Sequence, residues 1–483
     1  MNIASAIEGH EAARIALYED DVVVTYGELQ QRVANVRAGL ATRGVTVGSR
    51  VLIVGENEVD FVLAIFAAIG LGAEVAPIRA SNPLPEVERK ASAIEPAVVV
   101  LCQSALWIND TGLDNQHPHV CSVAEAESEG AELDNVGLAE RQPGDTAFLL
   151  LTSGVTSMSK VAVLSHGNLD WVQRAVISGA DDGMRPDDVA LGLLPLTHIF
   201  GLNVVLFSSL RSGGSIVLQQ RFDPVRSMEL IETHQVTTIS GAPAMWQRWV
   251  ATDYPGNPLV SVRRASSGAA ALPIKTFNAV RDRFGLEIGE GYGLTETSPI
   301  VTWSRGVIPR AGSVGLPLEG VEIVIVEPDG TPVESGDAGE IVVRSPGVFQ
   351  GYLDAKEATE QVLTADGWFW TGDMGVFDSD GFLYLVDRIK DIVIVSGFNV
   401  YPAEVESVIM QHPDVRGVIV VGTSDERTGE AVVAHVSGQV SVEELDEYCR
   451  ASLSRYKCPS EFHLVDELPV SPNGKPLRRA LRT

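Results

Sequence analysis

Hydroxyl side chains, a glycine and a lysine are concentrated in residues 151–160, directly after a short apolar run. Backbone N–H groups and hydroxyls on a loop that follows a strand can donate to phosphate oxygens, and a lysine adds positive charge. The segment therefore predicts a polyphosphate-binding loop, although a Ser/Thr-rich surface turn has a similar composition. The candidate ligands are Thr152, Ser153, Gly154, Thr156 and Lys160.

A second segment, residues 289–297, combines alternate glycines with an aromatic ring, hydroxyls and carboxylates. Glycines allow a backbone to approach a ligand closely, and Tyr292 offers a flat face to a nucleotide base. Thr295 can donate to a phosphate, and Glu296 is a suitable ligand for Mg²⁺. A tight turn would explain the glycines alone, whereas the whole string favours a nucleotide site.

Two charged segments and a C-terminal loop complete the set of candidates. Asp373 ends the run 367–373, and a carboxylate aimed at vicinal hydroxyls is the usual way to hold a ribose. Arg388 and Lys390 lie in the mixed-charge segment 387–391, which as a plain linker would only be solvated. Lys475 lies on a loop bounded by glycine and proline. It could swing into a site on another domain or remain an exposed basic tail.

The apolar pattern predicts the elements that must position these side chains. Buried strands are expected over residues 50–55, 97–101, 147–151, 215–218 and 237–240, with a buried helix over 59–71. Asp223 followed by Pro224 predicts the start of another helix. This alternation favours parallel α/β sheets covered by helices.

The pattern changes near residue 300. Short runs and turn signals over 320–385 predict a small antiparallel β unit. The chain after residue 391 reads as a compact α+β tail. Its helices are expected over 403–411 and after the capping box at 441–444.

The bulk properties limit the kind of protein this is. A chain of 483 residues is longer than one hydrophobic core usually supports, so several domains are expected. A net charge of −28 repels nucleic acid and anionic membrane surfaces, so an anionic substrate needs locally placed cations and N–H groups. Four separated cysteines, no leader-like N-terminus and no apolar stretch of membrane-spanning length predict a reduced, cytoplasmic protein.

Taken in order and spacing, the candidate segments resemble the adenylate-forming superfamily, and within it the acyl-CoA synthetase branch. The strings 195–201, 267–270, 339–344, 396–406 and 456–459 extend the resemblance over nearly the whole chain. It implies an α/β fold with two α/β subdomains and a β-barrel-like subdomain. It also implies an AMP- and acyl-binding domain over 1–386, a hinge over 387–391 and a small mobile α+β C-terminal lid over 392–483.

The resemblance gives each candidate a role. Residues 152–160 would bind phosphates, Thr295 the α-phosphate and Glu296 the Mg²⁺, while Lys475 would neutralise the α-phosphate and the attacking carboxylate. The nucleoside residues would be Ser267, Gly268, Ala269, Ala270, Glu290, Gly291 and Tyr292 for adenine, and Asp373 and Arg388 for ribose. Lys390 would be the hinge, and domain rotation would bring Gly397 and Phe398 to a thiol channel.

The reaction so implied is ATP-dependent activation of a carboxylic acid as an acyl-adenylate, followed by transfer to coenzyme A. An acyl carrier protein is an alternative acceptor. His198 would gate the acyl pocket, although a lone histidine is more often a core residue. The pocket candidates are His198, Phe200, Val204, Gly241, Ala242, Met245, Ala269, Ala270 and Leu294, with Ile199 and Val205 assigned to the core. Since most are small or apolar, an apolar or aryl acid is expected, with a fatty acid preferred.

The phosphate loop departs from the family pattern at Val155, Ser157, Ser159 and Val161. Val155 removes a hydroxyl, which could cost roughly 1–3 kcal/mol if that hydroxyl contacts phosphate. Ser157 and Val161 replace permissive glycines, and Glu290 replaces a common amide. These changes motivate a rival reading, a weakly active or non-catalytic nucleotide- or acyl-binding protein. The retained Lys160, Glu296, Asp373, Arg388 and Lys475 argue for an active enzyme.

Overall fold

The computed structural model describes residues 1–111, 119–152, 160–179, 183–304, 306–396, 398–425, 427–470 and 477–481. Its first sheet has the order β6-β5-β3-β4-β7-β8 and is parallel except for the β7–β8 pair. The strands are β3 (Arg50–Gly55), β4 (Glu74–Arg79), β5 (Val98–Leu101), β6 (Val120–Ser122), β7 (Thr146–Leu151) and β8 (Val161–Ser165). The helices of this region are α1 (Tyr26–Thr42), α2 (Val59–Gly70), α3 (Leu84–Ile94) and α4 (Val123–Gly130).

The second sheet has the order β15-β14-β13-β12-β11-β9-β10-β1-β2. The strands from β13 to β1 run parallel, and the outer ones are antiparallel. Its strands are β1 (Ile15–Glu19), β2 (Val22–Thr25), β9 (Val189–Gly192), β10 (Ser215–Leu218), β11 (Thr238–Gly241), β12 (Arg264–Ser267), β13 (Ile288–Tyr292), β14 (Thr302–Trp303) and β15 (Leu316–Pro317). The helices are α5 (His166–Ile177), the π-helical η4 (Phe200–Phe207), α6 (Ser208–Arg211), α7 (Pro224–His234), α8 (Pro243–Ala251) and α9 (Ile274–Phe284).

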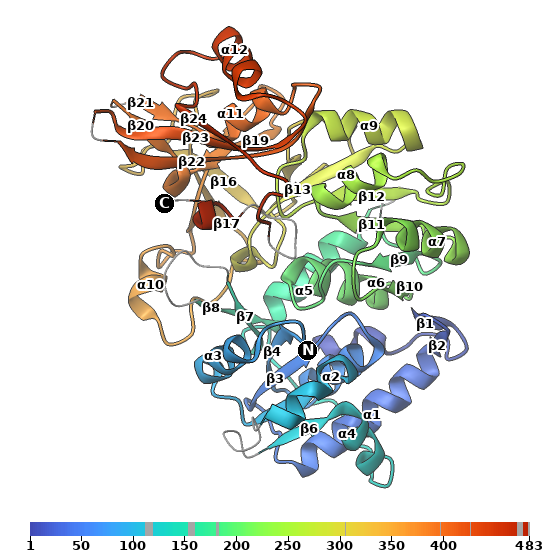
Figure 1. The fold of residues 1–483 in the computed structure, drawn as a ribbon. Helices are drawn as coiled ribbons and strands as arrows, with labels where there is room; N and C mark the ends of the chain where they lie inside the picture. Colours follow the sequence, from blue (N-terminus) through green and yellow to red (C-terminus); the bar gives the residue numbers. More distant parts are fainter. Residues whose placement is uncertain are drawn as a thin grey trace.

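The remaining sheets are smaller. An antiparallel sheet of β16 (Glu322–Val326), β17 (Gly339–Arg344), β18 (Phe369–Phe377) and β19 (Leu383–Arg388) is the β unit that the turn signals predict, and α10 (Lys356–Glu360) lies between β17 and β18 in the chain. The C-terminal unit contains β20 (Val393–Val395), β21 (Phe398–Val400), β22 (Val415–Asp425), β23 (Gly429–Gly438), β24 (Glu461–Leu464), α11 (Pro402–Ile409) and α12 (Val442–Ser452). Figure 1 shows this unit, in orange and red, at the end of the molecule opposite the blue first sheet.

Local sequence explains where several helices begin. The Asp223 side chain accepts a hydrogen bond from the N–H of Arg226 and so caps α7, and Pro224 occupies the first helical position. Ser441 and Glu444 form the predicted capping box of α12. The predicted buried helix is α2, in which every residue except Asp60 is buried. None of the helices in the described ranges is long and apolar enough to cross a bilayer.

The two large sheets share one core. The rings of Phe66 in α2 and Phe148 in β7 lie 4.8 and 5.9 Å from that of Phe207 in η4. Since Phe207 follows the second sheet's β9 along the chain, apolar burial fixes one sheet against the other. This packing fixes the strand ends of one sheet relative to those of the other, and the candidate site depends on that arrangement.

Candidate active site

The carboxyl end of β12 and the middle of β13 place two predicted adenine residues side by side. Ser267 pairs in register with Glu290, and both side chains are buried. Glu290 Oε2 accepts a hydrogen bond of 3.1 Å from the N–H of Leu272. Glu290 Oε1 and Ser267 Oγ have no partner among the described residues. Because buried polar atoms are normally satisfied, this pair indicates a ligand that supplies the missing hydrogen bonds.

Burial also changes the charge of Glu290. Desolvation raises the pKa of this carboxyl to about 8, and the N–H of Leu272 lowers it only in part. The side chain is therefore mostly protonated at neutral pH. A neutral carboxyl offers one donor and one acceptor, so it resembles the amide that it replaces more closely than a carboxylate would.

The predicted ribose residues form one hydrogen-bonded group with Tyr292. The Tyr292 hydroxyl donates to Asp373 Oδ2 at 2.8 Å, and Arg388 Nε lies 2.9 Å from Asp373 Oδ1. Asp373 and Arg388 face each other in register across β18 and β19. Burial and the Asp373 charge raise the pKa of Tyr292 well above its ordinary range, so its hydroxyl remains a donor. The group joins β13 to the antiparallel sheet.

The predicted metal ligand is connected to the phosphate loop through a tyrosine. The Tyr352 hydroxyl donates to Glu296 Oε1 at 2.8 Å, and Lys160 Nζ lies 4.6 Å from the centre of the Tyr352 ring. The N–H of Thr152 donates to the carbonyl of Lys160 at 2.8 Å, which continues the β7–β8 pairing to the start of the connecting loop. Thr295 and Glu296 lie on the 3₁₀ turn η5 (Thr295–Thr297). The structure thus brings Thr152, Lys160 and Glu296 together.

The next candidates belong to the acyl pocket and to the two adenine segments. Phe200 packs on Gly268, where a Cβ atom would lie 2.8 Å from the ring, so glycine is needed there. The N–H of Phe200 donates to His198 Nδ1 at 3.3 Å. Ala269 adopts a φ of 69° in the loop that Ala270 continues. Gly291 lies within β13, where residues 289–297 begin as a strand rather than a turn.

Several expectations from the sequence need correction or fall outside the described residues. Val161 belongs to β8 opposite Leu151, so it is a strand residue rather than part of a reshaped loop. Val204 packs with Val172 and Trp303 in a hydrophobic cluster, and the structure therefore places it in the core. Ile199 and Val205 are buried, as predicted. Ser153, Gly154, Val155, Thr156, Ser157, Ser159, Gly397 and Lys475 lie outside the described residues.

The hinge segment lies in the chain between β19 and the C-terminal unit. Lys390 is exposed on the 3₁₀ turn η6 (Ile389–Asp391). The preceding Asp387 accepts a hydrogen bond of 2.8 Å from the N–H of Ala403, at the start of α11. Phe398 is 57% exposed, and its ring lies 5.0 Å from that of Tyr456. An aromatic surface is therefore open to solvent beside the predicted thiol segment.

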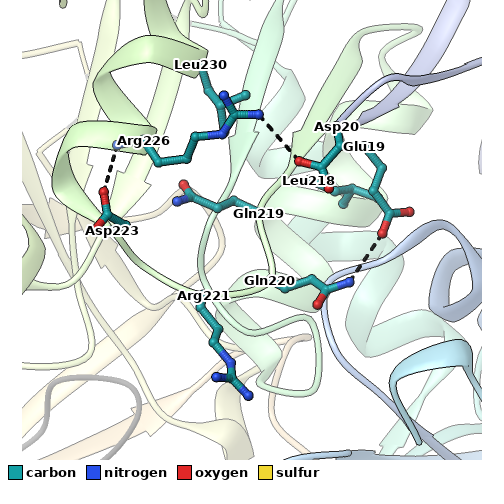
Figure 2. Close-up of a pocket in the computed structure, with 9 residues that line it drawn as sticks. All are labelled: Glu19, Asp20, Leu218, Gln219, Gln220, Arg221, Asp223, Arg226 and Leu230. Carbon is teal, nitrogen blue, oxygen red and sulfur yellow. Dashed lines mark hydrogen bonds and ion pairs between the residues drawn. The ribbon is translucent and has the colours of Figure 1, made fainter. Parts of the chain in front are cut away.

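Sequence reasoning missed Tyr352, which links the metal and phosphate candidates. The ring of Phe349 meets those of Tyr352 and Phe369 edge-on, so the Tyr352 ring packs as a core aromatic does, and only its hydroxyl reaches the site. A separate hollow lies at the ends of β1 and β10 (Figure 2). There Arg226 lies 3.4 Å from Asp20, and Gln220 donates to Glu19. Since none of the nucleotide candidates lines this hollow, we do not assign it to the nucleotide.

The chain is similar to known proteins in sequence and in structure. The family model of the AMP-binding enzyme matches residues 4–353, and that of the AMP-binding enzyme C-terminal domain matches residues 404–475. A feruloyl-CoA synthase from an Amycolatopsis species is 34% identical, over 97% of this chain and 95% of that protein. A 4-coumarate–CoA ligase from Solanum tuberosum is 32% identical, over 96% and 89%. The crystal structure of ATP-bound MatB from Rhodopseudomonas palustris has a TM-score of 0.92 and 28% identity, covering 100% of this chain and 98% of that one.

The fold is α/β, and the unpartnered polar atoms on β12 and β13 suit a nucleotide ligand. The chain belongs to the AMP-binding enzyme family, in the acyl-CoA synthetase branch of the adenylate-forming superfamily. The AMP-forming CoA ligases of this family use ATP, Mg²⁺ and coenzyme A.

The side chains present fit these groups. The unpartnered Ser267 Oγ and Glu290 Oε1 suit a base. Glu296 Oε1 is used by Tyr352, which leaves Oε2 as a possible ligand. Among the described residues no cluster of three or more metal-ligating side chains occurs. A single carboxylate ligand, Glu296, suits Mg²⁺, which proteins usually hold through one or two carboxylates and the substrate phosphates.

Proposed function

We propose that this protein activates an aromatic carboxylic acid as its acyl-adenylate and then forms the thioester with coenzyme A. The main observation is that one short segment, from Glu290 to Glu296, supports three parts of a nucleotide site. Glu290 offers an unpartnered buried oxygen, Tyr292 orients the ribose candidate Asp373, and Glu296 is held by Tyr352. A ligand with a base, a sugar and phosphates would satisfy all three.

In the first half-reaction the substrate carboxylate attacks the α-phosphorus of ATP, and pyrophosphate leaves. Both reactants are anions, so the residues act mainly by neutralising charge and fixing geometry. Lys475 neutralises the α-phosphate and the incoming carboxylate, Thr295 donates to the α-phosphate, and the loop that ends at Lys160 binds the departing phosphates. Mg²⁺ supplies positive charge to the phosphate oxygens, with Glu296 as its protein ligand.

In the second half-reaction the thiol sulfur attacks the acyl carbonyl, and AMP leaves. A lysine that serves only the first step suits a mobile domain. We assign the N-terminal domain to residues 1–386, the hinge to 387–391 with Lys390, and the C-terminal lid to 392–483. Rotation about this hinge withdraws Lys475 and brings Gly397 and Phe398 towards the thiol. The exposed ring of Phe398 supports this role, since it has surface available for a ligand.

The choice of acid rests on the relatives and on the pocket candidates. The relatives are named for ferulate and 4-coumarate, both aromatic acids, and they align along nearly the whole chain. We therefore place an aryl acid ahead of the fatty acid that the sequence favours. The ring of Phe200 packs on Gly268, so an aromatic surface lies beside one of the adenine candidates. None of the pocket candidates is a lysine or arginine, which disfavours a second carboxylate on the substrate.

A panel of acids with ATP, Mg²⁺ and coenzyme A tests this assignment. The products are identified by mass with ferulate, 4-coumarate, benzoate, a long-chain fatty acid and a dicarboxylic acid as substrates. We expect the CoA thioester of an aryl acid to form with the highest kcat/KM. Turnover restricted to fatty acids would reject the aryl assignment. Acyl transfer only to a carrier-protein phosphopantetheine would reject coenzyme A as the acceptor.

A further inference from the structure

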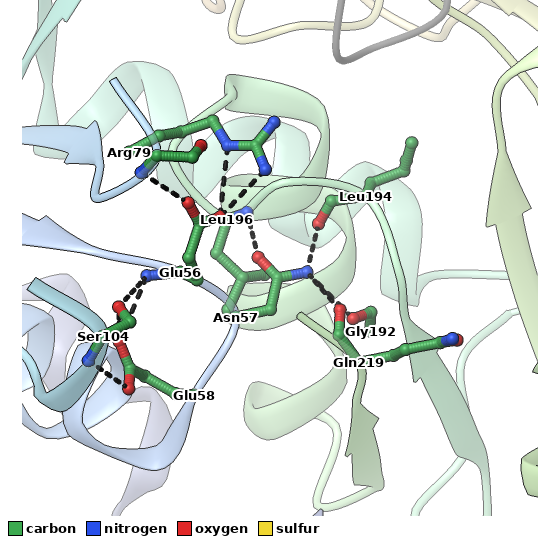
Figure 3. A network of polar contacts seen from close by, with 10 residues as sticks. Glu56, Asn57, Glu58, Arg79, Ser104, Gly192, Leu194, Leu196 and Gln219 are labelled. Carbon is green, nitrogen blue, oxygen red and sulfur yellow. Dashed lines mark hydrogen bonds and ion pairs between the residues drawn. The ribbon is translucent and has the colours of Figure 1, made fainter. Parts of the chain in front are cut away.

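Asn57 is a buried residue that follows β3 of the first sheet, and its side chain hydrogen-bonds to backbone groups at the ends of β9 and β10 of the second sheet. Its Nδ2 donates to the carbonyls of Gly192, Leu194 and Gln219 at 2.9, 3.0 and 3.3 Å. Its Oδ1 accepts from the N–H of Leu196 at 2.9 Å. Figure 3 shows the amide between these backbone groups. One side chain, 3% exposed, therefore fixes the chain where β9 and β10 end.

The neighbours of Asn57 in the sequence behave differently. Glu56 pairs with Arg79 at 2.9 Å, and the hydroxyl of Ser104 donates to Glu58. Those contacts stay within the first sheet and the loops after its strands (Figure 3). Asn57 alone among the three residues reaches the segment that leads to the acyl-pocket candidates.

The segment that Asn57 holds continues directly into the turn of His198. The N–H of His198 donates to the carbonyl of Pro195 at 3.0 Å, and its carbonyl accepts from Leu202 at 2.8 Å. The start of η4 packs tightly on the segment that Asn57 binds, since a Cβ atom on Gly201 would lie 2.3 Å from the Pro195 oxygen. A shift of the chain at Leu194 or Leu196 would therefore move His198 and, beyond it, Phe200.

We propose that Asn57 is a positioning residue that sets the place of His198 and Phe200, and so the shape of the acyl site. The inference rests on the proposed function, because it assumes that these two side chains line that site. Asn57 itself touches no substrate. Its loss should therefore alter the use of the acid more than the use of ATP, most of whose candidates lie on β12, β13, β18, β19, η5 and the phosphate loop.

The chain offers a matched control in Asn2. This asparagine is also buried and also makes three Nδ2 bonds and one Oδ1 bond to backbone groups. Its partners are Ile69, Gly70, Ala139 and Ala4, none of which is a site candidate. Asn2→Ala and Asn57→Ala thus remove the same number of buried hydrogen bonds. A purely structural role would give the two variants the same effects.

The experiment compares the two variants with the wild-type protein in two assays. In acid-dependent pyrophosphate release, Asn57→Ala should lower kcat/KM for the acid by about 10- to 100-fold while the KM for ATP stays within about twofold. Asn57→Asp, which keeps the acceptor for Leu196 but loses the donors, should be similarly impaired. Asn2→Ala should leave both parameters close to those of the wild type. Equal effects of Asn57→Ala and Asn2→Ala would overturn the proposal.

Amide hydrogen exchange provides the second assay and does not depend on activity. In the ligand-free protein, Asn57→Ala should speed exchange in residues 192–202, and Asn2→Ala should not. Unchanged exchange there would overturn the proposal as well. A wild-type protein that releases no pyrophosphate with any acid would instead refute the proposed function, and the exchange result would still decide whether Asn57 holds this segment.

Discussion

Glu290 gives the most quantitative prediction, because its burial links protonation to stability. A carboxyl whose pKa rises on folding keeps its proton in the native state after the unfolded chain has lost it. With a folded pKa of about 8 against an ordinary value of 4.5, Glu290 should lower the free energy of unfolding as pH rises between these values. From pH 5 to 7 the loss should be about 2–3 kcal/mol, since one pKa unit corresponds to about 1.4 kcal/mol.

The substitution Glu290→Gln removes this titration while keeping the shape of the side chain. The amide oxygen can still accept from the N–H of Leu272, and the NH₂ group takes the place of the carboxyl proton. The variant should therefore gain stability relative to the wild type as pH rises, by about 2–3 kcal/mol between pH 5 and 7. Glu334→Gln, at an exposed residue between β16 and β17, serves as the control.

Urea unfolding of the ligand-free protein at a series of pH values measures this difference. Unfolding is followed by tryptophan fluorescence, because all seven tryptophans precede the C-terminal unit and report on the larger part. Parallel stability profiles for wild type and Glu290→Gln would refute the argument that burial keeps Glu290 neutral. With ATP present, the same reasoning predicts that the wild-type KM for ATP rises above pH 8 while that of Glu290→Gln does not.

Three further predictions concern the nucleotide and acyl residues. Tyr352→Phe should lower kcat/KM for MgATP about 10- to 100-fold, because the buried Glu296 carboxylate loses a hydrogen bond worth roughly 1–3 kcal/mol; pyrophosphate-release kinetics over a range of Mg²⁺ concentrations measure this loss. Asp373→Asn should raise the KM for ATP roughly tenfold with a smaller effect on the KM for the acid, as steady-state kinetics would show. Gly268→Ala should displace the Phe200 ring, which a Cβ atom would approach to 2.8 Å, and so raise the KM for bulky aryl acids more than for acetate.

Local sequence was sufficient for most of the scaffold. Apolar runs such as residues 50–55 and the cap formed by Asp223 and Pro224 are short-range features, and they appear in the structure as β3 and the start of α7. The order of the motif strings identified the family for the same reason, because each string is contiguous. Within the described part of the chain, Val161 was assigned to the loop but begins β8, because a single residue decides the assignment at a boundary between loop and strand.

Long-range contacts were beyond a local pattern. Asn57 binds backbone groups more than 130 residues away in the sequence, and Tyr352 reaches Glu296 across 56 residues. Neither side chain has a distinctive local context. The protonation of Glu290 depends on the water that folding removes, so its position in a glycine-rich string gives no sign of it. The hydrogen bonds of Asn57 and Tyr352 and the protonation of Glu290 are therefore the main features of the site that the structure adds.

The most direct test of the central claim is acid-dependent release of pyrophosphate from ATP and Mg²⁺, in wild type and in Lys475→Ala. We predict release with an aryl acid that the variant loses by several orders of magnitude, while the variant still binds ATP. Thioester formation from a supplied acyl-adenylate should survive in the variant, since the lysine serves only the first half-reaction. No release from the wild type with any acid, although ATP binds, would contradict the account and favour a nucleotide-binding protein without adenylation activity.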